Sequence, residues 1–305
     1  MNQTVVALGM FDGVHLAHRA LLTKAAKIAH ENGDTAVAFT YDNHPRELFS
    51  GSFSYLCTRE QREAEIRSTG CDRMDSVVFD AAFAAMEPET FLDWLTARCE
   101  GGISAIVVGY DYRFGAKAKG DTALLATLCA ARKIRLCVID KVTVDGETCS
   151  STNIREAIRA GETERAERML GRPYTLSGTV VHAKALGRQY DRPTANLDAG
   201  KQLLPKDGVY ATELIFAGRR YDAVTNVGTN PTVGGRDRTV ETHAIGASLD
   251  LYGKRIEVAF LKRLRDEKVF ASKDLLFAQI AADAENAKKV CEERKKGVYN
   301  SEPLC

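Results

Sequence analysis

The chain has 305 residues, a length that favours two domains, and 45% of them are hydrophobic, which is enough for ordinary globular cores. A formal net charge of +1 argues against a nucleic-acid-binding protein, and the longest apolar runs, such as Ile103 to Gly109, are too short to cross a membrane. The N-terminus lacks a basic region followed by a long apolar stretch, so we expect no signal peptide and a cytoplasmic protein.

The first half of the chain alternates short apolar segments with helical patterns. We expect strands at Thr4–Leu8, Thr35–Tyr41, Ser76–Phe79, Ala105–Val108 and Arg135–Ile139. Helix starts are marked by Thr58 with Gln61 in a capping box, by Pro88 in a first turn and by Asp121 as a cap. Apolar strands separated by helices predict a parallel sheet with helices on both faces. Ligands of such sheets bind beyond the carboxyl ends of the strands.

The pattern changes near Gly171, where we place the boundary between a domain of residues 1–171 and a domain of residues 172–305. The expected strands of the second domain are Thr175–Val181, Val209–Phe216, Arg220–Thr225, Thr242–Ile245 and Ile256–Leu261. Gly218 indicates a hairpin, and Ser272 is placed to cap a terminal helix. Several short strands with turn signals predict a small antiparallel β-barrel.

The eight cysteines form no CxxC pair, and no histidine lies at zinc-finger spacing. In a chain without an export signal, this pattern predicts reduced thiols with structural roles. We therefore assign them no function.

The segment Gly9 to His18 reads GMFDGVHLAH and follows the first expected strand. Gly9 and Gly13 allow the backbone to turn sharply and to approach a ligand. His15 and His18 are three residues apart and share one face of a first helical turn, where free N–H groups suit phosphate. The two imidazoles could hydrogen-bond the oxygens of a reacting α-phosphate, and simple packing of the rings is the alternative.

The segment Cys149 to Arg155 reads CSSTNIR. Ser151 and Thr152 are good helix caps, and Arg155, one turn later, can reach the same anion. An ordinary capped helix is the alternative interpretation.

The segment Val108 to Gly115, VGYDYRFG, leaves the fourth expected strand at the ligand-binding end of the sheet. Asp111 could accept a hydrogen bond from a ribose hydroxyl or an adenine edge. A simple turn is the alternative.

Together these segments resemble the nucleotidyltransferase domain of bacterial bifunctional riboflavin kinase/FAD synthetases. That family carries HxGH near its N-terminus and SSTxIR later. Thr40–Phe49, TYDNHPRELF, is similar to its TFxPHPxxxF segment, and FDGVH at Phe11–His15 also matches. The resemblance spans nearly the whole first domain and implies a Rossmann-like α/β nucleotidyltransferase fold. One departure is Ala17, which stands where the HxGH motif has glycine.

The resemblance implies adenylylation of FMN by ATP, giving FAD and pyrophosphate. It implies that His15 and His18 hold and polarise the ATP phosphates, and that Mg²⁺ neutralises charge on the triphosphate. Ser151, Thr152 and Arg155 would bind the departing pyrophosphate. The full implied set of ATP- and phosphate-binding residues is Gly9, Phe11, Asp111, Ser151, Thr152 and Arg155.

In the second half, Pro193 to Leu197 reads PTANL. Thr194 and Asn196 are two residues apart and share a face if the segment is extended. Their side-chain oxygens are hard ligands suited to a nucleotide-bound Mg²⁺, whereas a turn is the alternative interpretation.

The wider series of segments resembles the riboflavin kinase domain from end to end. The matching segments are GTVVHAKALGRQYDRPTANL, DGVYA, TNVGTNPTVGG, VETHAI and DLYGKRIEVAFLKRLRDE. The resemblance implies that Glu241 is the general base, taking the proton from the ribityl 5′-hydroxyl as it attacks the γ-phosphate of ATP. A solvated strand carboxylate is the alternative.

The nucleotide loop of this domain departs from the family pattern VxxGxxxGRxLGFPTAN. Ala183 replaces the first glycine, and Tyr190, Asp191 and Arg192 replace LGF. Glycines supply the close backbone approach that binds phosphates, so an altered loop bears on kinase activity.

The leading hypothesis is a bifunctional transferase that uses Mg²⁺ and ATP to convert riboflavin to FMN and FMN to FAD. The alternatives are a monofunctional FAD synthase with an impaired kinase domain and a non-catalytic flavin or nucleotide sensor. The expected partners are these small molecules, with no nucleic acid and no membrane, and self-association is left open.

Overall fold

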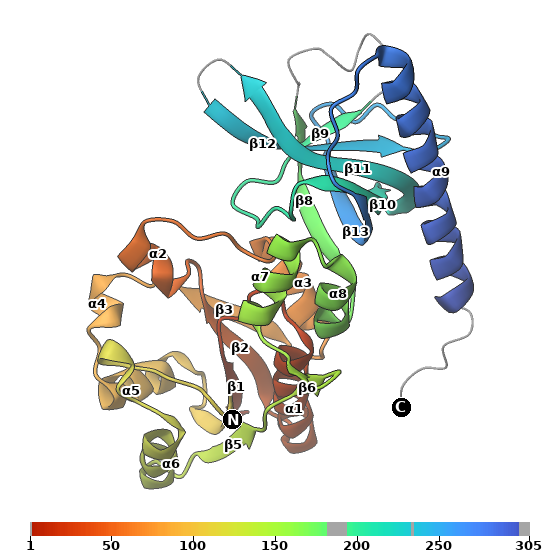
Figure 1. The fold of residues 1–305 in the computed structure, drawn as a ribbon. Helices are drawn as coiled ribbons and strands as arrows, with labels where there is room; N and C mark the ends of the chain where they lie inside the picture. The colour runs from red at the N-terminus through yellow and green to blue at the C-terminus, as the bar shows by residue number, and fades with distance from the viewer. Residues whose placement is uncertain (1, 182–193, 233–234, 299–305) are drawn as a thin grey trace. The chain divides into compact units, whose positions relative to one another are not determined.

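The computed structural model describes residues 2–181, 194–232 and 235–298 (Figure 1). The chain divides into two compact units, Met1–Ser151 and Thr152–Cys305. The domain boundary expected after residue 171 stays a prediction. Within the described ranges, no helix combines the length and apolar character needed to cross a membrane.

The first unit is built on a five-stranded parallel sheet with the strand order β3-β2-β1-β4-β5. Its strands are β1 (Thr4–Leu8), β2 (Thr35–Tyr41), β3 (Arg73–Val77), β4 (Ile103–Gly109) and β5 (Arg135–Ile139). Its helices are α1 (Leu16–Asn32), α2 (Pro45–Ser50), α3 (Arg59–Arg67), α4 (Ala81–Ala84), α5 (Pro88–Arg98), α6 (Thr122–Ala131) and the 3₁₀ turn η1 (Ala116–Ala118). A small hairpin of β6 (Thr143–Val144) and β7 (Glu147–Thr148) follows. The predicted parallel α/β architecture is confirmed.

The central strand β1 is buried on both faces, which is why it reads as a continuous apolar run. Because side chains alternate along a strand, Val5 and Ala7 face one layer and Val6 and Leu8 face the other. The first pair belongs to a core shared with α1 and α3, and the second pair to a core shared with α5 and α6. Figure 1 shows these helices around the sheet of the first unit.

The third strand was predicted at Ser76–Phe79 and lies instead at Arg73–Val77. It is an edge strand, and edge strands tolerate charged side chains. Arg73 Nε donates to Asp75 Oδ1 at 3.0 Å, so the strand carries its own ion pair. The polar sequence RMDSV lacks the apolar run from which the other strands of this sheet were predicted.

The predicted helix starts are confirmed. Thr58 and Gln61 form a reciprocal capping box at α3. Pro88 is the first residue of α5, and Asp121 caps α6 by accepting a 2.9 Å hydrogen bond from the backbone N–H of Leu124.

The second unit contains a closed six-stranded barrel with the strand order β10-β11-β12-β9-β8-β13. Its strands are β8 (Tyr174–Val181), β9 (Ala195–Asp198), β10 (Gly208–Phe216), β11 (Arg219–Thr232), β12 (Gly235–Ala244) and β13 (Arg255–Arg265). Its helices are α7 (Ser151–Ala160), which starts at the last residue of the first unit, α8 (Thr163–Leu170) and α9 (Lys273–Val298). The predicted barrel with a terminal helix is confirmed, and β9 is a strand that the sequence did not reveal.

Helix α9 packs on the outside of the barrel. Ala287 shares a core with Ala211 and Val224 of the adjacent strands. A buried ion pair joins the helix to β13, because Arg265 Nη2 lies 2.6 Å from Asp283 Oδ2 and the two side chains are 15% and 5% exposed. The guanidinium is bidentate, since Arg265 Nε also donates to Asp283 Oδ1 at 3.0 Å.

We expect Asp283→Ala to lower the free energy of unfolding of the second unit by about 3–5 kcal/mol, because Arg265 would be left buried without its carboxylate. Cys291, which is fully buried on the same helix, can report the unfolding. The measurement is the urea dependence of its labelling by a maleimide, read by peptide mass spectrometry. The matched control is Asp274→Ala in the exposed first turn of α9, which should cost under about 1 kcal/mol. Equal effects of the two variants would contradict the prediction.

Candidate active sites

The loop after β1 has an unusual backbone. Phe11 and Val14 adopt left-handed conformations, with φ of 49° and 38°, and their side chains are completely buried. Such conformations cost about 1–2 kcal/mol each for a residue with a Cβ, so burial of these side chains holds the loop. Asp12 anchors it further, because its Oδ1 accepts a 2.9 Å hydrogen bond from the backbone N–H of Leu56. Gly9 is needed for close packing, since a Cβ there would lie 2.8 Å from the ring of Phe11.

His15 and His18 come together at the start of α1. Their rings stack with centroids 3.6 Å apart, and His15 Nδ1 accepts a 3.3 Å hydrogen bond from the backbone N–H of His18, which caps the helix. A neutral His15 ring that accepts at Nδ1 carries its proton on Nε2, so we assign Nε2 as a donor. Burial, and secondly the neighbouring His15, hold the pKa of His18 well below its usual value. His18 Nδ1 is buried with no hydrogen-bond partner among the described residues. His18 therefore offers a neutral imidazole to a ligand.

The lowered pKa of His18 has a consequence for stability. Above the unfolded pKa of about 6.5, His18 is neutral in both the folded and the unfolded protein, and the folded state keeps its full stability. As the pH falls from there toward the folded pKa, the unfolded chain binds a proton that the folded protein does not, so stability is lost. The unfolding free energy of the first unit should therefore fall by up to about 1.4 kcal/mol per pH unit below about pH 6.5. Urea unfolding followed by the fluorescence of Trp94, the single tryptophan, measures this. His18→Gln should flatten the dependence, and an unchanged slope would show that the pKa is not lowered.

The CSSTNIR segment is joined to the same loop. Ser151 Oγ donates a 3.0 Å hydrogen bond to the carbonyl oxygen of Asp12, and Cys149 Sγ lies 3.7 Å from a ring nitrogen of His15. Ser151 therefore lies at the predicted phosphate loop. Thr152 and Arg155 both lie on α7 in the second unit. Thr152 is exposed, and Arg155, three residues later, is buried. Their contact with a phosphate stays a prediction.

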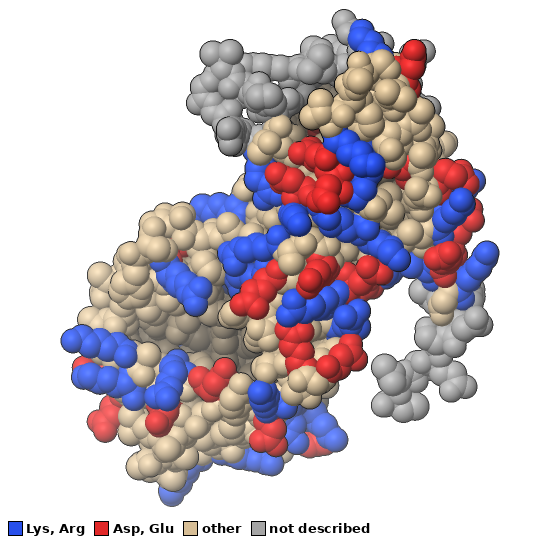
Figure 2. Space-filling model, viewed as in Figure 1, with Lys and Arg blue, Asp and Glu red and all other residues tan. Residues whose placement is uncertain are grey.

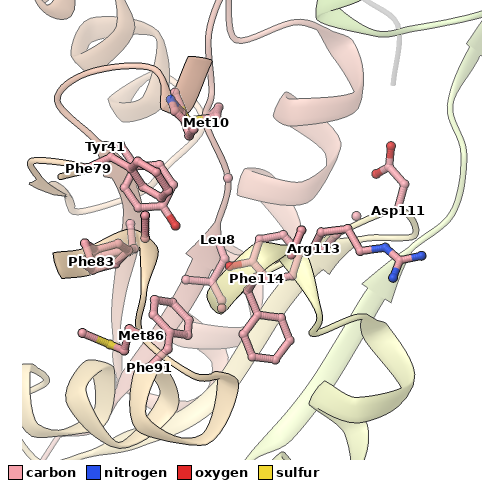
Figure 3. A pocket seen from close by; sticks show the side chains of 18 of the residues that line it. Leu8, Met10, Tyr41, Phe79, Phe83, Met86, Phe91, Asp111, Arg113 and Phe114 are labelled. Carbon is pink, nitrogen blue, oxygen red and sulfur yellow. The ribbon is translucent and has the colours of Figure 1, made fainter. Parts of the chain in front are cut away.

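A cavity of about 580 Å³ opens beyond the carboxyl ends of the strands, at the edge of the sheet where ligands are expected (Figure 3). Three predicted residues line it, namely Gly9, His18 and Asp111. Phe11 is absent from the lining and instead contacts His18 edge to face, with ring centroids 5.3 Å apart. On the face of the first unit seen in Figure 2, uncharged residues line a hollow and charged side chains stand at its rim.

Aromatic side chains form one wall of the cavity. Tyr41 contacts Phe79 and Phe83 with ring centroids 5.2 and 5.5 Å apart, and Phe83 contacts Phe91 at 5.9 Å. Burial raises the pKa of Tyr41 to about 12, so its hydroxyl stays neutral. Figure 3 shows these rings together on one side of the cavity. Such a wall suits a planar apolar ring. Sequence reasoning missed this wall because its members do not form one motif. Tyr41 ends β2, Phe79 follows β3, and Phe83 and Phe91 lie within α4 and α5.

A second set of polar residues lies on adjacent strands of the barrel. Glu241 on β12 is the register partner of Asn196 on β9 and of Asn226 on β11, so the three side chains share a face. Asn226 Nδ2 donates to Glu267 Oε1 at 3.2 Å. Burial, and secondly the charge of Glu267, raise the pKa of Glu241. Thr194 is exposed just before β9. The sequence analysis named Glu241, Asn196 and Thr194 as candidates and did not name Asn226 or Glu267, and the roles of all five stay predictions.

The departures in the nucleotide loop, Ala183, Tyr190, Asp191 and Arg192, lie outside the described residues. The cysteines at described positions are free thiols. Burial raises the pKa of Cys71, Cys129 and Cys291 to about 11. Thiols of this kind are poor nucleophiles at neutral pH, in keeping with structural roles.

Comparison with known proteins gives a family match for each half of the chain. Residues 1–153 match the family model for FAD synthetase, and residues 170–291 match that for riboflavin kinase. The chain is 33% identical over 290 residues to a bifunctional riboflavin kinase/FMN adenylyltransferase of Listeria monocytogenes, covering 93% of this chain and 91% of that protein. It is 35% identical over 288 residues to the protein of that name from Escherichia coli, covering 93% and 92%.

A solved structure extends the likeness to the whole fold. A crystal structure described as a macrolide-efflux protein from Streptococcus pneumoniae is 30% identical, with a TM-score of 0.86 over 94% of both chains. The region matched to FAD synthetase contains the parallel sheet. The region matched to riboflavin kinase contains the barrel and extends into the terminal helix. The chain belongs to the family of bifunctional riboflavin kinase/FMN adenylyltransferases, which are transferases.

Proposed function

We propose that this chain converts riboflavin to FMN and then FMN to FAD, with ATP as the donor in both reactions. The observation that carries the proposal is the presence, on one chain, of matches to both the FAD synthetase and the riboflavin kinase families. The relatives are named for both activities, and the alignments cover more than nine-tenths of their length. This favours the bifunctional reaction over a monofunctional synthase or a sensor.

For adenylylation, the aromatic wall would bind the flavin ring, and His15 and His18 would face the reacting phosphate. An oxygen of the FMN phosphate forms a bond to the α-phosphorus of ATP as the bond from that phosphorus to the bridging oxygen breaks, and pyrophosphate leaves. Neutral imidazole donors stabilise the charge that develops on the α-phosphate. The segment led by Ser151, with Thr152 and Arg155, would hold the pyrophosphate.

For phosphorylation, Glu241 would accept the proton of the ribityl 5′-hydroxyl as that oxygen attacks the γ-phosphorus of ATP and ADP leaves. A raised pKa supports this role, because a base works best when its pKa lies near the operating pH. Asn196 lies beside Glu241 in the sheet register, so the base and the amide oxygen would meet the same nucleotide.

Magnesium fits the donor atoms available in the barrel. Thr194 and Asn196 offer neutral hard oxygens, which suit an ion that arrives with ATP and keeps several waters. When bound, Mg²⁺ would neutralise charge on the phosphates. Holding the cation is assigned to Thr194 and Asn196, and proton removal to Glu241.

One assay tests the proposal. Purified protein is incubated with Mg-ATP and either riboflavin or FMN, and the flavins are resolved by chromatography. We expect FMN and FAD from riboflavin, and FAD from FMN. Conversion of FMN to FAD with riboflavin untouched would reduce the protein to an FAD synthase, and no turnover of either flavin would leave only a binding role.

A further inference from the structure

Two tyrosines bring hydroxyl groups to the cavity of the first unit. Tyr41 ends β2 and Tyr112 follows β4, and both residues line the cavity. The ring of Tyr112 stacks on Phe114 with centroids 5.8 Å apart, and its backbone N–H donates to the carbonyl oxygen of Gly109 at 3.1 Å. Both tyrosines pack against the same hydrophobic core. Two segments that are far apart in sequence therefore supply hydroxyls to one cavity.

Neither hydroxyl makes a hydrogen bond to any residue in the described part of the chain. Buried tyrosines usually find a partner for this group. The hydroxyls of Tyr174 and Tyr210, for example, donate to backbone carbonyl oxygens at 2.6 and 2.5 Å. Tyr41 and Tyr112 are half-buried and line the cavity, so their hydroxyls are left for a molecule that fills it.

Both hydroxyls keep their protons. Burial raises the pKa of Tyr41 to about 12, and burial, with secondly the neighbouring Tyr41, raises the pKa of Tyr112 well above its usual value. Each group is therefore a neutral O–H donor at neutral pH. Figure 3 shows the Tyr41 hydroxyl on the side of its ring that faces Leu8 and Phe114, which also line the cavity. Because the two tyrosines are neighbours, one ligand can meet both donors.

The packing of the aromatic wall does not require the hydroxyl of Tyr41. Its ring contacts Phe79 and Phe83 edge to face, and a phenyl ring makes such contacts equally well. In the family segment TFxPHPxxxF, to which Thr40–Phe49 is similar, the corresponding position is phenylalanine. This chain therefore carries an added hydroxyl for which packing does not account.

We propose that the hydroxyls of Tyr41 and Tyr112 donate hydrogen bonds to the polar edge of the flavin ring and thereby strengthen the binding of FMN for adenylylation. This inference rests on the proposed function of the first unit and deepens it. A flavin ring has an apolar dimethylbenzene end and, at the other end, two carbonyl oxygens and ring nitrogens that accept hydrogen bonds. When the ring leaves water for an apolar cavity, these acceptors need new donors. Tyr41 and Tyr112 offer two neutral donors among the aromatic rings of the cavity.

The test uses Tyr41→Phe, Tyr112→Phe and the double variant, because phenylalanine keeps each ring and removes only the hydroxyl. FAD formation is measured with varied FMN, with varied ATP, and with lumiflavin as a competitor that has the flavin ring but no ribityl phosphate. We expect the KM for FMN and the inhibition constant of lumiflavin to rise together, about three- to tenfold in each single variant, the effect of one neutral hydrogen bond. The kcat and the KM for ATP should stay within about twofold, because a contact to the ring is equally strong before and during the reaction.

Stability separates this role from a structural one. Urea unfolding followed by the fluorescence of Trp94 should be unchanged or shifted to higher urea, because the folded protein loses a hydroxyl that had no protein partner. Tyr110→Phe is the matched control. Tyr110 lies in the same loop as Tyr112, is 46% exposed and is not among the described residues that line the cavity. Its replacement should leave all the constants within about twofold.

Unchanged constants for FMN and lumiflavin in the double variant would overturn the proposal. So would a rise for FMN without one for lumiflavin, which would place the hydroxyls at the ribityl phosphate, and a rise confined to the KM for ATP, which would place them at the nucleotide. Lower stability together with higher constants would assign the hydroxyls a structural role instead. Absence of FAD formation by the wild-type protein would overturn the proposed function itself, which is a separate result.

Discussion

Replacement of His15 by alanine is expected to slow the formation of FAD from FMN by about 10²- to 10³-fold, the effect of removing one preorganised donor from a developing charge. Two losses combine in this variant. The Nε2–H donor disappears, and the backbone N–H of His18 loses the ring nitrogen that caps it. Phosphorylation of riboflavin should stay within about twofold, because His15 belongs to the first unit and the proposed kinase residues belong to the second. Initial rates with FMN and with riboflavin measure both.

His30→Ala provides the control for this prediction. His30 lies near the end of the same helix, is exposed and is 3.3 Å from Asp72. Its replacement removes an imidazole from α1 without touching the loop after β1, and both activities should persist. Loss of both activities in His15→Ala would mean that the variant fails to fold or that the two activities are not divided as proposed.

Glu241→Gln is expected to lower riboflavin phosphorylation by about 10²- to 10⁴-fold, the usual contribution of a general base. Glutamine keeps the shape and the polar contacts of the side chain, so the loss would report the missing proton acceptor rather than packing. FAD formation from added FMN should remain within about twofold. Because the same protein sample performs both reactions, the second activity reports that the variant is folded.

A carboxylate elsewhere in the barrel serves for comparison. Glu257→Gln, on β13, removes a half-buried charge that is not a register partner of β9 or β12. It should spare both activities. Full riboflavin phosphorylation by Glu241→Gln would remove the residue from its proposed role and point to another base.

Most of the fold could be predicted because its elements have local causes. A few neighbouring residues were enough to predict a strand from the apolar run Thr4–Leu8. They were also enough to predict a helix start from the capping box of Thr58 and Gln61. Strand β3 was misplaced because its polar residues are acceptable only at the edge of a sheet, a position that the local sequence does not reveal. Strand β9 was missed because PTAN suits a turn equally well, and pairing with β8 and β12 makes it extended.

The candidate functional residues divide in the same way. His15, His18 and Glu241 could be named from the sequence because they lie in short ordered motifs. The aromatic wall was missed because Tyr41, Phe83 and others come from separate segments that meet only when the sheet and its helices pack. Paired side chains such as Asn226 and Glu267 were missed for a similar reason, since 41 residues separate them in sequence.

The left-handed residues after β1 bear on how the protein meets its substrates. Phe11 and Val14 are buried in the core of the first unit, so the loop takes its shape as the sheet forms. The conformational entropy of ordering this loop is therefore lost during folding and not during binding. A nucleotide would meet a preorganised receptor, and its binding free energy would be available for aligning the two phosphates that must react.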